Sequence, residues 1–491
     1  MKAAGATAGL VVASGWSPRA YAQNDRIHIA LIGTGSQNCF HIEHGIAGNP
    51  QLRVVAMADV LRPSLANARK ALCGDDEAKL KEISSHLYLD YREMLEKEKD
   101  NIDAVVIATP FKTHYEIVMD CLDAGKFVFC EKTMAHTIEC CRNIVTKCHE
   151  TGLFVQCGHQ RRYSPDYIHA AKGMCEDKRL GRVTYMEAQW HRNGDWRRPR
   201  PRVVVNKETG ETAEYQLTPT EQALITDLDK LINWRVYEEY SAGLISELAT
   251  HHIEVMNWLM GTPPARVYAT GGTDYWKDGR TTGDNIIIVM EYDLNARHHG
   301  FFAMSAKNTI QEKEPYYSQL RRPYTVRATW TGSLQTSMKG EGILVLGDKG
   351  MYELHEKIDP AGRGCKFQAE PVRIWLDPKT MEPTTDENII NYITSTGQSQ
   401  KFSRLEDQPV IAFETEVDQA LQTKISDVYQ FEAFAKHIKE GGKPRTNEMC
   451  GLMASICDIA AHDSLVQKKT IDIDPAWYTF DFETPDPFVI A

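Results

Sequence analysis

Short apolar runs alternate with amphipathic stretches over the first third of the chain. The apolar runs are rich in Val, Ile, Ala and Phe and predict strands at residues 27–33, 52–58, 86–89, 102–108, 126–130 and 153–157. Stretches between them, such as 92–99 and 114–124, carry the apolar spacing of helices. Strands that alternate with helices predict a doubly wound parallel sheet of the α/β class, which binds ligands at the carboxyl ends of its strands.

The pattern changes after residue 158. Alternation of apolar and polar positions predicts strands at residues 182–192, 266–269, 285–292, 327–331 and 342–346. Helical spacing returns at residues 247–260, 426–439 and 447–467, whereas 199–220 and 356–410 are predicted as long loops. We therefore expect a first domain at 23–157 and an α+β domain with a large open, mainly antiparallel sheet at 158–491. The C-terminal helices of the second domain are candidates to pack back on the first domain.

The composition is that of a globular protein with 42% hydrophobic residues and a net charge of −11. This charge argues against nucleic acid or an anionic membrane surface as the main partner. The sequence has no uninterrupted apolar run of the roughly 20 residues that cross a bilayer.

The N-terminus has the features of an export signal. A small, apolar stretch precedes Ala20-Tyr21-Ala22, which predicts a leader at residues 1–22. The twelve cysteines form no CxxC pair, so they are expected to be free thiols of a protein that folds in a reducing compartment. Both features are reconciled by export to the periplasm after cytoplasmic folding; a disordered arm on a cytoplasmic protein is the alternative.

The first predicted strand ends in Gly33-Thr34-Gly35, and the second ends in Asp59. Two glycines after a strand allow the backbone to approach a pyrophosphate, and a carboxylate at the next strand tip binds the ribose hydroxyls of NAD and repels the 2′-phosphate of NADP. The third glycine of this motif is replaced by Asn38, which predicts a wider helix–strand approach. An ordinary strand–turn–helix junction is the alternative. The predicted cofactor turn is Gly33, Thr34, Gly35, Ser36, Gln37 and Asn38.

Two further strand tips carry polar residues. Thr109 and Pro110 follow one buried strand, with His114 opening the next helix, and Glu131 and Lys132 follow another. All five are predicted at the cofactor edge, where Lys132 can exchange a proton with a substrate hydroxyl. A helix-start hydrogen bond for His114 and a surface ion pair for Glu131 and Lys132 are the alternatives.

A third group of residues lies on one predicted helix. Glu247, His251, Glu254 and Trp258 share a face at helical spacing. A carboxylate one turn from an imidazole can orient it, so Glu247 is predicted to orient His251 as a catalytic base. No third metal ligand is placed nearby, so no metal is expected. A buried structural histidine is the alternative.

These residues together resemble the glucose-fructose oxidoreductase/inositol dehydrogenase family (Gfo/Idh/MocA). The shared features are the Gly33-Thr34-Gly35 turn, Ala108-Thr109-Pro110, Glu131-Lys132 and the Glu247/His251 helix. The resemblance implies a Rossmann domain followed by an open-sheet domain, NAD as cofactor, and oxidation of a sugar or cyclitol hydroxyl by Lys132 and His251. Where the family has Glu-Lys-Pro and Asp-x-x-x-His, this chain has Thr133 and Glu247, so a less rigid lysine loop and a carboxylate displaced by one methylene are expected.

A narrower resemblance is to an exported branch that includes glycoside 3-dehydrogenase-like members. It rests on segments that combine tryptophan with His, Asn and Arg, residues that suit the apolar faces and hydroxyls of a sugar. Core tryptophans with surface arginines are the alternative. The implied substrate residues are His159, Arg161, Arg162, Tyr163, Trp190, His191, Asn193, Trp196 and His251.

The sequence thus predicts an NAD-dependent oxidoreductase acting on a secondary hydroxyl of a sugar or glycoside, with C3 as the candidate carbon. The first alternative is a glycosidase that keeps NAD bound and cleaves by transient oxidation and elimination. The second is a non-catalytic binder. The resemblance also implies a homodimer or homotetramer formed through the open sheet.

Overall fold

The computed structural model describes residues 25–175, 179–206, 208–294, 324–355, 365–369, 373–374, 401–402, 410–412 and 425–487. The leader predicted at 1–22 lies outside these residues, as does most of the loop predicted at 356–410. The described residues of that loop form β15 (Cys365–Ala369), β16 (Arg373–Ile374) and β17 (Lys401–Phe402), and they reach β18 (Val410–Ala412).

Six parallel strands form the sheet of the first domain, in the order β3-β2-β1-β4-β5-β6. They are β1 (Ile27–Ile32), β2 (Leu52–Ala58), β3 (Leu87–Tyr88), β4 (Ala104–Ile107), β5 (Phe127–Cys130) and β6 (Val155–Cys157). The connecting helices are α1 (Ser36–His41), α2 (Arg62–Cys73), α3 (Glu77–Ser84), α4 (Tyr91–Lys97), α5 (His114–Asp123) and α6 (Ile138–Thr151). All six predicted strands and the doubly wound class are confirmed.

The strand order reverses beside β1, which lies between β2 and β4. Helices that leave β1 and β4 therefore cross to opposite faces and open a crevice at the carboxyl ends of these strands. Every residue of β4 is buried, as expected of a central strand covered on both faces. The crevice lies where the Gly33 turn and Asp59 were predicted.

Nine strands form the second sheet, in the order β18-β15-β14-β13-β7-β12-β11-β10-β19. Only the β7–β12 pair is parallel among these described strands, so the sheet is mainly antiparallel, as predicted. The remaining bounds are β7 (Val183–His191), β10 (Arg266–Gly272), β11 (Asn285–Leu294), β12 (Tyr324–Ser333), β13 (Glu341–Gly347), β14 (Gly350–Leu354) and β19 (Ile471–Asp472).

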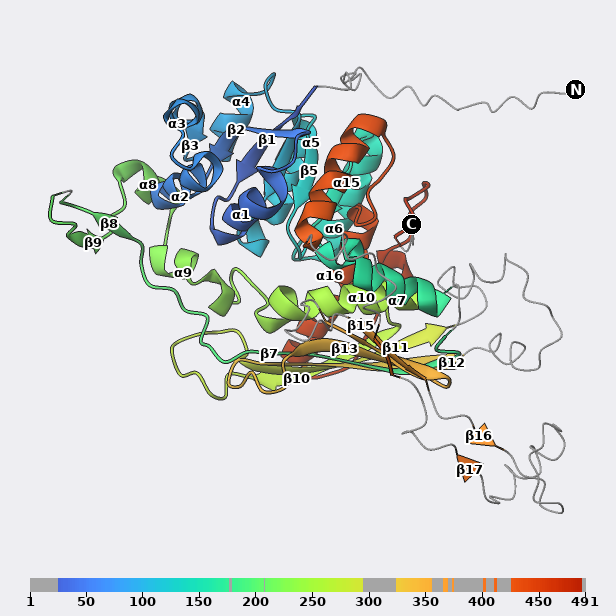
Figure 1. Cartoon of the computed structure of the whole chain (residues 1–491). Coiled ribbons are helices and arrows are strands. Elements are labelled where there is room, and N and C mark those ends of the chain that lie inside the picture. Colours follow the sequence, from blue (N-terminus) through green and yellow to red (C-terminus); the bar gives the residue numbers. More distant parts are fainter. Residues whose placement is uncertain are drawn as a thin grey trace, which may run out of the picture.

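Helices cover the face of this sheet that is turned towards the first domain (Figure 1). They are α7 (Pro165–Cys175), α10 (Thr250–Met260) and α16 (Glu448–Gln467). α10 is preceded by a π-helical turn at Ile245–Ala249. On the opposite face, Tyr268 of β10 and Ile287 of β11 are 40% and 47% exposed.

The stretch 199–220, predicted as a loop, contains regular structure. It forms a hairpin of β8 (Arg202–Val204) and β9 (Thr212–Glu214) and enters α8 (Pro219–Leu224), which α9 (Leu228–Ile232) follows. The start of α8 is fixed by a capping box between Thr218 and Glu221. This Thr-x-x-Glu signal was present in the sequence, so the loop prediction was wrong at this helix.

The C-terminal helices complete both domains. α15 (Ser426–Glu440) packs on the first domain, with the ring of Phe431 stacked 4.8 Å from that of Phe129. Among the described residues, α16 is long and apolar enough to cross a bilayer. However, 72% of its apolar stretch is buried inside the protein. It contacts α6 and β6 in the first domain and α10 and β10 in the second. α16 is therefore a core helix between the two sheets.

Candidate active site

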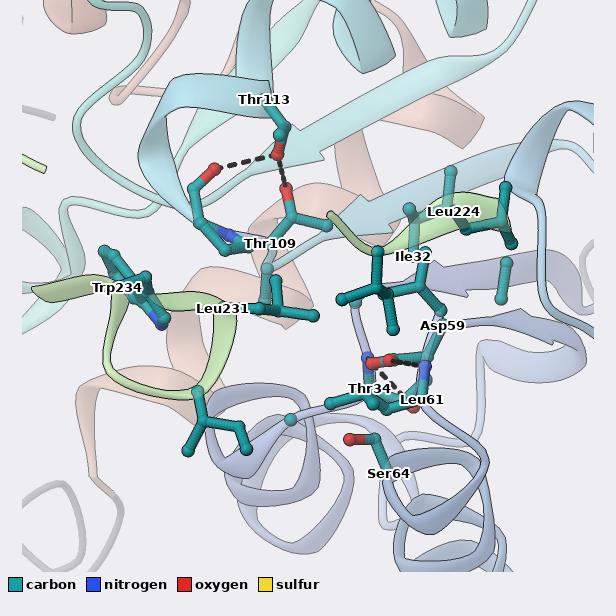
Figure 2. Close-up of a pocket in the computed structure, with 18 of the residues that line it drawn as sticks. Ile32, Thr34, Asp59, Leu61, Ser64, Thr109, Thr113, Leu224, Leu231 and Trp234 are labelled. Atoms are coloured by element: carbon teal, nitrogen blue, oxygen red, sulfur yellow. Dashed lines mark hydrogen bonds between the residues drawn. The ribbon is translucent and has the colours of Figure 1, made fainter. Parts of the chain in front are cut away.

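A cavity of about 640 Å³ lies at the carboxyl ends of β1, β2 and β4 (Figure 2). On the first-domain side it is lined by Gly33, Thr34, Gly35 and Ser36, by Asp59, and by Thr109, Pro110 and Thr113. The other wall comes from the segment between β7 and α10, including Leu224, Leu231 and Trp234. The predicted cofactor residues of three separate strand tips thus meet around one space.

The two glycines of the turn have different roles. Gly33 has φ +76°, and a Cβ there would lie 2.8 Å from the carbonyl oxygen of Ala108, so only glycine fits. A Cβ on Gly35 would meet no atom within 4 Å, because that position faces open space in the cavity. The backbone at Gly35 is therefore accessible to a pyrophosphate, which fits a dinucleotide.

Asp59 is held at the tip of β2 by the turn itself. Its carboxylate accepts hydrogen bonds from the backbone N–H of Thr34 at 2.7 Å and of Leu61 at 2.8 Å. Burial raises the pKa of Asp59 to about 6, although these hydrogen bonds act to lower it. The carboxylate is thus mainly ionised at neutral pH and keeps further lone pairs for ribose hydroxyls.

Asn38 performs a function that a third glycine cannot. Its side-chain amide is buried and donates to the carbonyl oxygen of Gly33 at 2.8 Å. Asn38 thus connects α1 directly to the turn by a hydrogen bond. The wider approach of helix and strand expected from this residue stays a prediction.

His114 and Glu131, predicted to contact the cofactor, instead organise the loops around it. The imidazole of His114 lies 2.8 Å from the carbonyl oxygen of Thr133 and 3.0 Å from that of Thr109, so it joins two strand-tip loops. Glu131 accepts from the backbone N–H of Lys132, and its Oε1 also contacts Gln37 and His41.

His41 is a buried cation between two carboxylates. Its ring nitrogens lie 2.9 Å from Glu131 and 2.8 Å from Asp427 of α15. Burial would lower the pKa of His41, but the hydrogen bonds to Asp427 and Glu131 raise it to about 9. No local motif predicts this triad, because Asp427 is almost four hundred residues away from His41.

The ammonium group of Lys132 points at the turn that precedes His251. Its Nζ donates to the carbonyl oxygens of Glu247 at 3.0 Å and Ser246 at 3.3 Å. An ammonium has three N–H groups, so one remains for a substrate oxygen.

The residue after Lys132 is fixed by the C-terminal helix. Thr133 donates through its hydroxyl to Asp458 of α16 at 3.0 Å, and the next backbone N–H, of Met134, donates to Ser455 of the same helix at 3.2 Å. Burial raises the pKa of Asp458 to about 7. These bonds hold the loop at the position where the family motif has a proline, and the expectation of a less rigid loop stays a prediction.

Two imidazoles lie beside Lys132 with unused hydrogen-bonding atoms. His251 Nδ1 and both ring nitrogens of His159 are buried and have no hydrogen-bond partner among the described residues. Burial and the charge of Lys132 lower the pKa of His251 well below its ordinary value, while burial, Arg162 and Lys132 lower that of His159 to about 3. Both rings are neutral at pH 7 and suited to accept or donate hydrogen bonds with a hydroxylated ligand.

Glu247 does not orient His251 as predicted. Its carboxylate accepts from Arg235 Nε at 3.0 Å and from the hydroxyl of Ser241 at 3.1 Å. The reason is the π-helical turn at Ile245–Ala249, which widens the helix and removes the i, i+4 alignment assumed for Glu247 and His251. Glu247 instead anchors Arg235.

An aromatic residue and a charged residue, Trp190 and Arg161, lie close to His251. The ring of Trp190 lies 5.6 Å from that of His251, and the guanidinium of Arg161 lies 5.0 Å above Trp190. Arg161 also pairs with Glu341 at 3.0 Å. Trp190, Arg161, His159 and His251 are therefore brought together as predicted.

His252 connects this group of residues to the neighbouring strands β12 and β13. It accepts from Trp330 Nε1 at 3.0 Å and contacts Glu341 at 2.8 Å, so its Nε2 carries the proton. Neither Glu341 nor Trp330 stood out in the sequence, because each lies on a strand whose neighbours are set only by the folded sheet.

Other predicted substrate residues lie elsewhere. His191 lies next to Trp190 on β7, but its ring contacts Thr331 at 3.1 Å on the opposite face of the sheet, because successive strand residues point to opposite sides. Its prediction as a substrate residue is corrected. Arg162 is paired with Glu254 in the core, and the hydroxyl of Tyr163 contacts Thr446, so neither is available to a substrate.

Asn193 and Trp196 lie on the loop after β7. Asn193 is exposed and forms a bridge with Gln335, and Trp196 packs against the core with a φ of +64°. Neither residue contacts Lys132 or His251 in these interactions, so a substrate role for Asn193 and Trp196 stays a prediction.

The glycine turn, the strand-tip acid and the group formed by Lys132 and two neutral imidazoles are typical of a two-domain nucleotide-binding oxidoreductase. Residues 27–159 match the model of an oxidoreductase family with an NAD-binding Rossmann fold, and residues 172–372 match the C-terminal alpha/beta domain of the same family. The chain belongs to the Gfo/Idh/MocA family, and its first domain is that family's NAD-binding domain.

Curated relatives include inositol dehydrogenases. The chain is 30% identical over 217 residues to inositol 2-dehydrogenase of Rubrobacter xylanophilus, which covers 44% of this chain and 54% of that enzyme. It is 26% identical over 265 residues to inositol 2-dehydrogenase/D-chiro-inositol 3-dehydrogenase of Lactiplantibacillus plantarum, which covers 53% and 61%. The matched region thus spans little more than half the length of these relatives.

Solved structures share the fold. GenD2 from gentamicin A biosynthesis, in complex with NAD, aligns with a TM-score of 0.58 at 15% identity over 94% of this chain and 100% of that one. Aldose-aldose oxidoreductase from Caulobacter crescentus aligns with a TM-score of 0.57 at 17% identity over 91% and 100%.

Proposed function

We propose that this protein is an NAD-dependent oxidoreductase that converts a secondary hydroxyl of a sugar, cyclitol or glycoside into a ketone. The observation that carries the proposal is that one N–H of Lys132 and the unused ring nitrogens of His159 and His251 lie together. These groups suit a ligand with several hydroxyls, since each buried nitrogen needs a hydrogen-bond partner.

The residues divide the work of proton transfer. NAD, bound in the cavity at the glycine turn, supplies the acceptor for the hydride that leaves the carbinol carbon. Lys132 donates a hydrogen bond to the reacting oxygen and stabilises the negative charge that develops there. His251, neutral because of its lowered pKa, accepts the hydroxyl proton. The alcohol thus loses one hydride and one proton and becomes a ketone.

The substrate class is supported by the residues around Lys132 and by the relatives. His159 and His251 have buried ring nitrogens that suit hydroxyl groups, and the ring of Trp190 lies beside His251. Relatives such as the Rubrobacter enzyme are named inositol 2-dehydrogenases, and an inositol carries the same ring of secondary hydroxyls. Glycoside oxidation at C3 is the finer form of the proposal.

The test is a substrate panel on the full-length protein. We expect reduction of NAD, followed at 340 nm, with at least one member of a set of inositols, aldoses and alkyl or aryl glycosides. A primary alcohol of similar size serves as the negative control. No reduction with any cyclic polyol, in protein shown to bind NAD, contradicts the proposal.

A second function is cleavage of a glycoside through transient oxidation. It is favoured by the second-domain segment that covers the cofactor cavity, because a cofactor held through the cycle permits oxidation, elimination and reduction in one site. Release of the aglycone without accumulation of NADH distinguishes this function from net oxidation.

We also propose export of the folded protein and dimerisation through the exposed face of the nine-stranded sheet. Tyr268 and Ile287 supply apolar area on that face. The mature N-terminus and the mass in solution test these two proposals, and a monomer would contradict the second.

A further inference from the structure

Glu131 and Lys132 are consecutive residues of opposite charge, yet their side chains form no ion pair with each other among the residues that the structure describes. Glu131 Oε2 accepts a hydrogen bond from the backbone N–H of Lys132 at 3.1 Å. The ammonium group of Lys132 is directed instead to the carbonyl oxygens of Ser246 and Glu247. Other groups must therefore hold the carboxylate of Glu131.

The carboxylate of Glu131 is held by a second cation, His41 of α1. His41 Nε2 lies 2.9 Å from Glu131 Oε1, and the side-chain amide of Gln37 donates to the same oxygen at 3.2 Å. Gly158 encloses the carboxylate as well, because a Cβ at that position would lie only 3.0 Å from the carboxyl carbon of Glu131. Burial would raise the pKa of Glu131, but the hydrogen bond and charge of His41, together with the charge of Lys132, lower it, so Glu131 is ionised at neutral pH.

The positive charge of His41 depends on Asp427 of α15. His41 Nδ1 lies 2.8 Å from Asp427 Oδ1, so each ring nitrogen faces one carboxylate. The other rings in contact with His41 are uncharged: Phe129 of β5 and Phe431 of α15. Glu131 and Asp427 are therefore the titratable groups that face His41 from the packed elements. Burial would lower the pKa of His41, but the hydrogen bonds to Asp427 and Glu131 raise it to about 9, which keeps the imidazole charged at neutral pH.

Two cations, His41 and Lys132, thus compete for one carboxylate. A lysine side chain is a point charge on a flexible stem, and a buried carboxylate without a cationic partner attracts such a charge strongly. If His41 were neutral, the ammonium of Lys132 would be drawn towards Glu131 and away from the turn that precedes His251. Because His41 occupies Glu131, the ammonium stays on the carbonyl oxygens of that turn and keeps one N–H for a substrate oxygen.

We propose that His41 is a positioning residue that neutralises Glu131 and so keeps the ammonium of Lys132 directed at the substrate oxygen. The proposal rests on the role of Lys132 in the proposed function. His41 is fully buried, so it acts through Glu131 and not by contact with a substrate. Asp427 supports the same task from α15, because its charge keeps His41 protonated.

The test is a double-mutant cycle on the full-length protein, with kcat and KM measured for a polyol that the wild type oxidises. We expect His41→Gln to lower kcat about tenfold with a smaller change in KM, because the freed charge of Glu131 binds Lys132. Glu131→Gln added to His41→Gln should recover most of this loss, since the competing charge is gone. A purely structural role of His41 predicts no recovery in the double variant. His44→Gln, at an exposed histidine of the next helical turn, is the matched control and should keep the wild-type kcat.

A crystal structure of the His41→Gln variant gives a readout that does not depend on activity. We expect Lys132 Nζ to leave the carbonyl oxygens of Ser246 and Glu247 and to contact the carboxylate of Glu131. Asp427→Asn, which retains a hydrogen-bond acceptor for His41 but removes the charge, should move Nζ in the same direction and serves if His41→Gln does not fold.

The outcomes separate this proposal from the proposed function. A double variant no more active than His41→Gln, or Lys132 Nζ still on the two carbonyl oxygens in the folded variant, overturns the role of His41. A wild type that oxidises no polyol contradicts the proposed function, whereas the position of Nζ in the variant crystals still decides whether His41 keeps Glu131 and Lys132 apart.

Discussion

The hydroxyl of Thr133 donates a 3.0 Å hydrogen bond to the buried carboxylate of Asp458. This bond links the residue after Lys132 to a helix from the other end of the sequence. It gives the lysine loop a support that the sequence motif alone does not contain, and it makes Asp458 a positioning residue for Lys132.

We expect Thr133→Val to lower kcat about tenfold with little change in NAD content, since one hydrogen bond to a carboxylate is lost. Thr133→Ser keeps the hydroxyl and should recover most of the activity. Asp458→Asn should also remove any step near pH 7 from the kcat profile, because the pKa of Asp458 is raised to about 7. Equal activity in the Val and Ser variants would show that the bond does not position Lys132.

Lys132→Ala should lower kcat by roughly a hundredfold or more, the range expected for loss of a group that stabilises the negative charge on the reacting oxygen. NAD content should stay near that of the wild type, because Lys132 does not line the cofactor cavity. Lys147→Ala, which breaks an exposed pair with Asp123 on the same domain, is the control. Unchanged turnover in Lys132→Ala would remove the assigned role.

Gly35→Ala should fold normally and bind NAD about tenfold more weakly. The backbone at Gly35 has an ordinary φ of −68°, and the added methyl group would lie in the cavity rather than against protein atoms. Gly33→Ala should instead destabilise the fold. Because Gly33 has a φ of +76° and an added Cβ would collide with Ala108, we expect a loss of about 1–3 kcal/mol in the free energy of unfolding. Thermal unfolding and NAD titration of both variants check these expectations.

The free energy of unfolding should fall as pH rises from about 6.5 to above 9. The pKa of His41 is raised to about 9 in the folded protein and returns to its ordinary value of 6.5 on unfolding, so its stabilisation is complete below 6.5 and is lost as the folded form deprotonates. The upper bound is about 3 kcal/mol for this shift.

Urea unfolding at pH 7 and pH 9.5 measures this loss. His41→Gln should reduce the difference between the two pH values, whereas His44→Gln, an exposed histidine stacked on Phe40 one helical turn away, should not. An unchanged difference in His41→Gln would assign the pH dependence to other groups.

The parts of the site that follow strand tips could be predicted from sequence. A buried apolar run fixes where a strand ends, and the parallel topology brings those ends to one edge, so Gly33, Asp59 and Thr109 were placed correctly around one cavity. The family resemblance, rather than this reasoning, predicted that Lys132 and His251 lie together, and the charge of Lys132 does contribute to the lowered pKa of His251.

Two features were not accessible in this way. Helical spacing assumes a regular α-helix, and the π-helical turn before α10 moved Glu247 from His251 to Arg235. Partners such as Asp458 and Glu341 are decided by tertiary packing of distant elements. His191 is different: the alternation along β7 already implied that it points away from Trp190, and that rule was available in the sequence.

The position of α15 and α16 has a consequence for biosynthesis. Both helices complete the first domain, through the contact of His41 with Asp427 and the packing of α16 on β6 and α6, yet they are synthesised long after β6. The sheet of the nucleotide-binding half is therefore synthesised well before the helices that complete its core. Premature termination before residue 426 would leave neither half able to fold, so truncated chains should be degraded rather than accumulate as a free Rossmann domain.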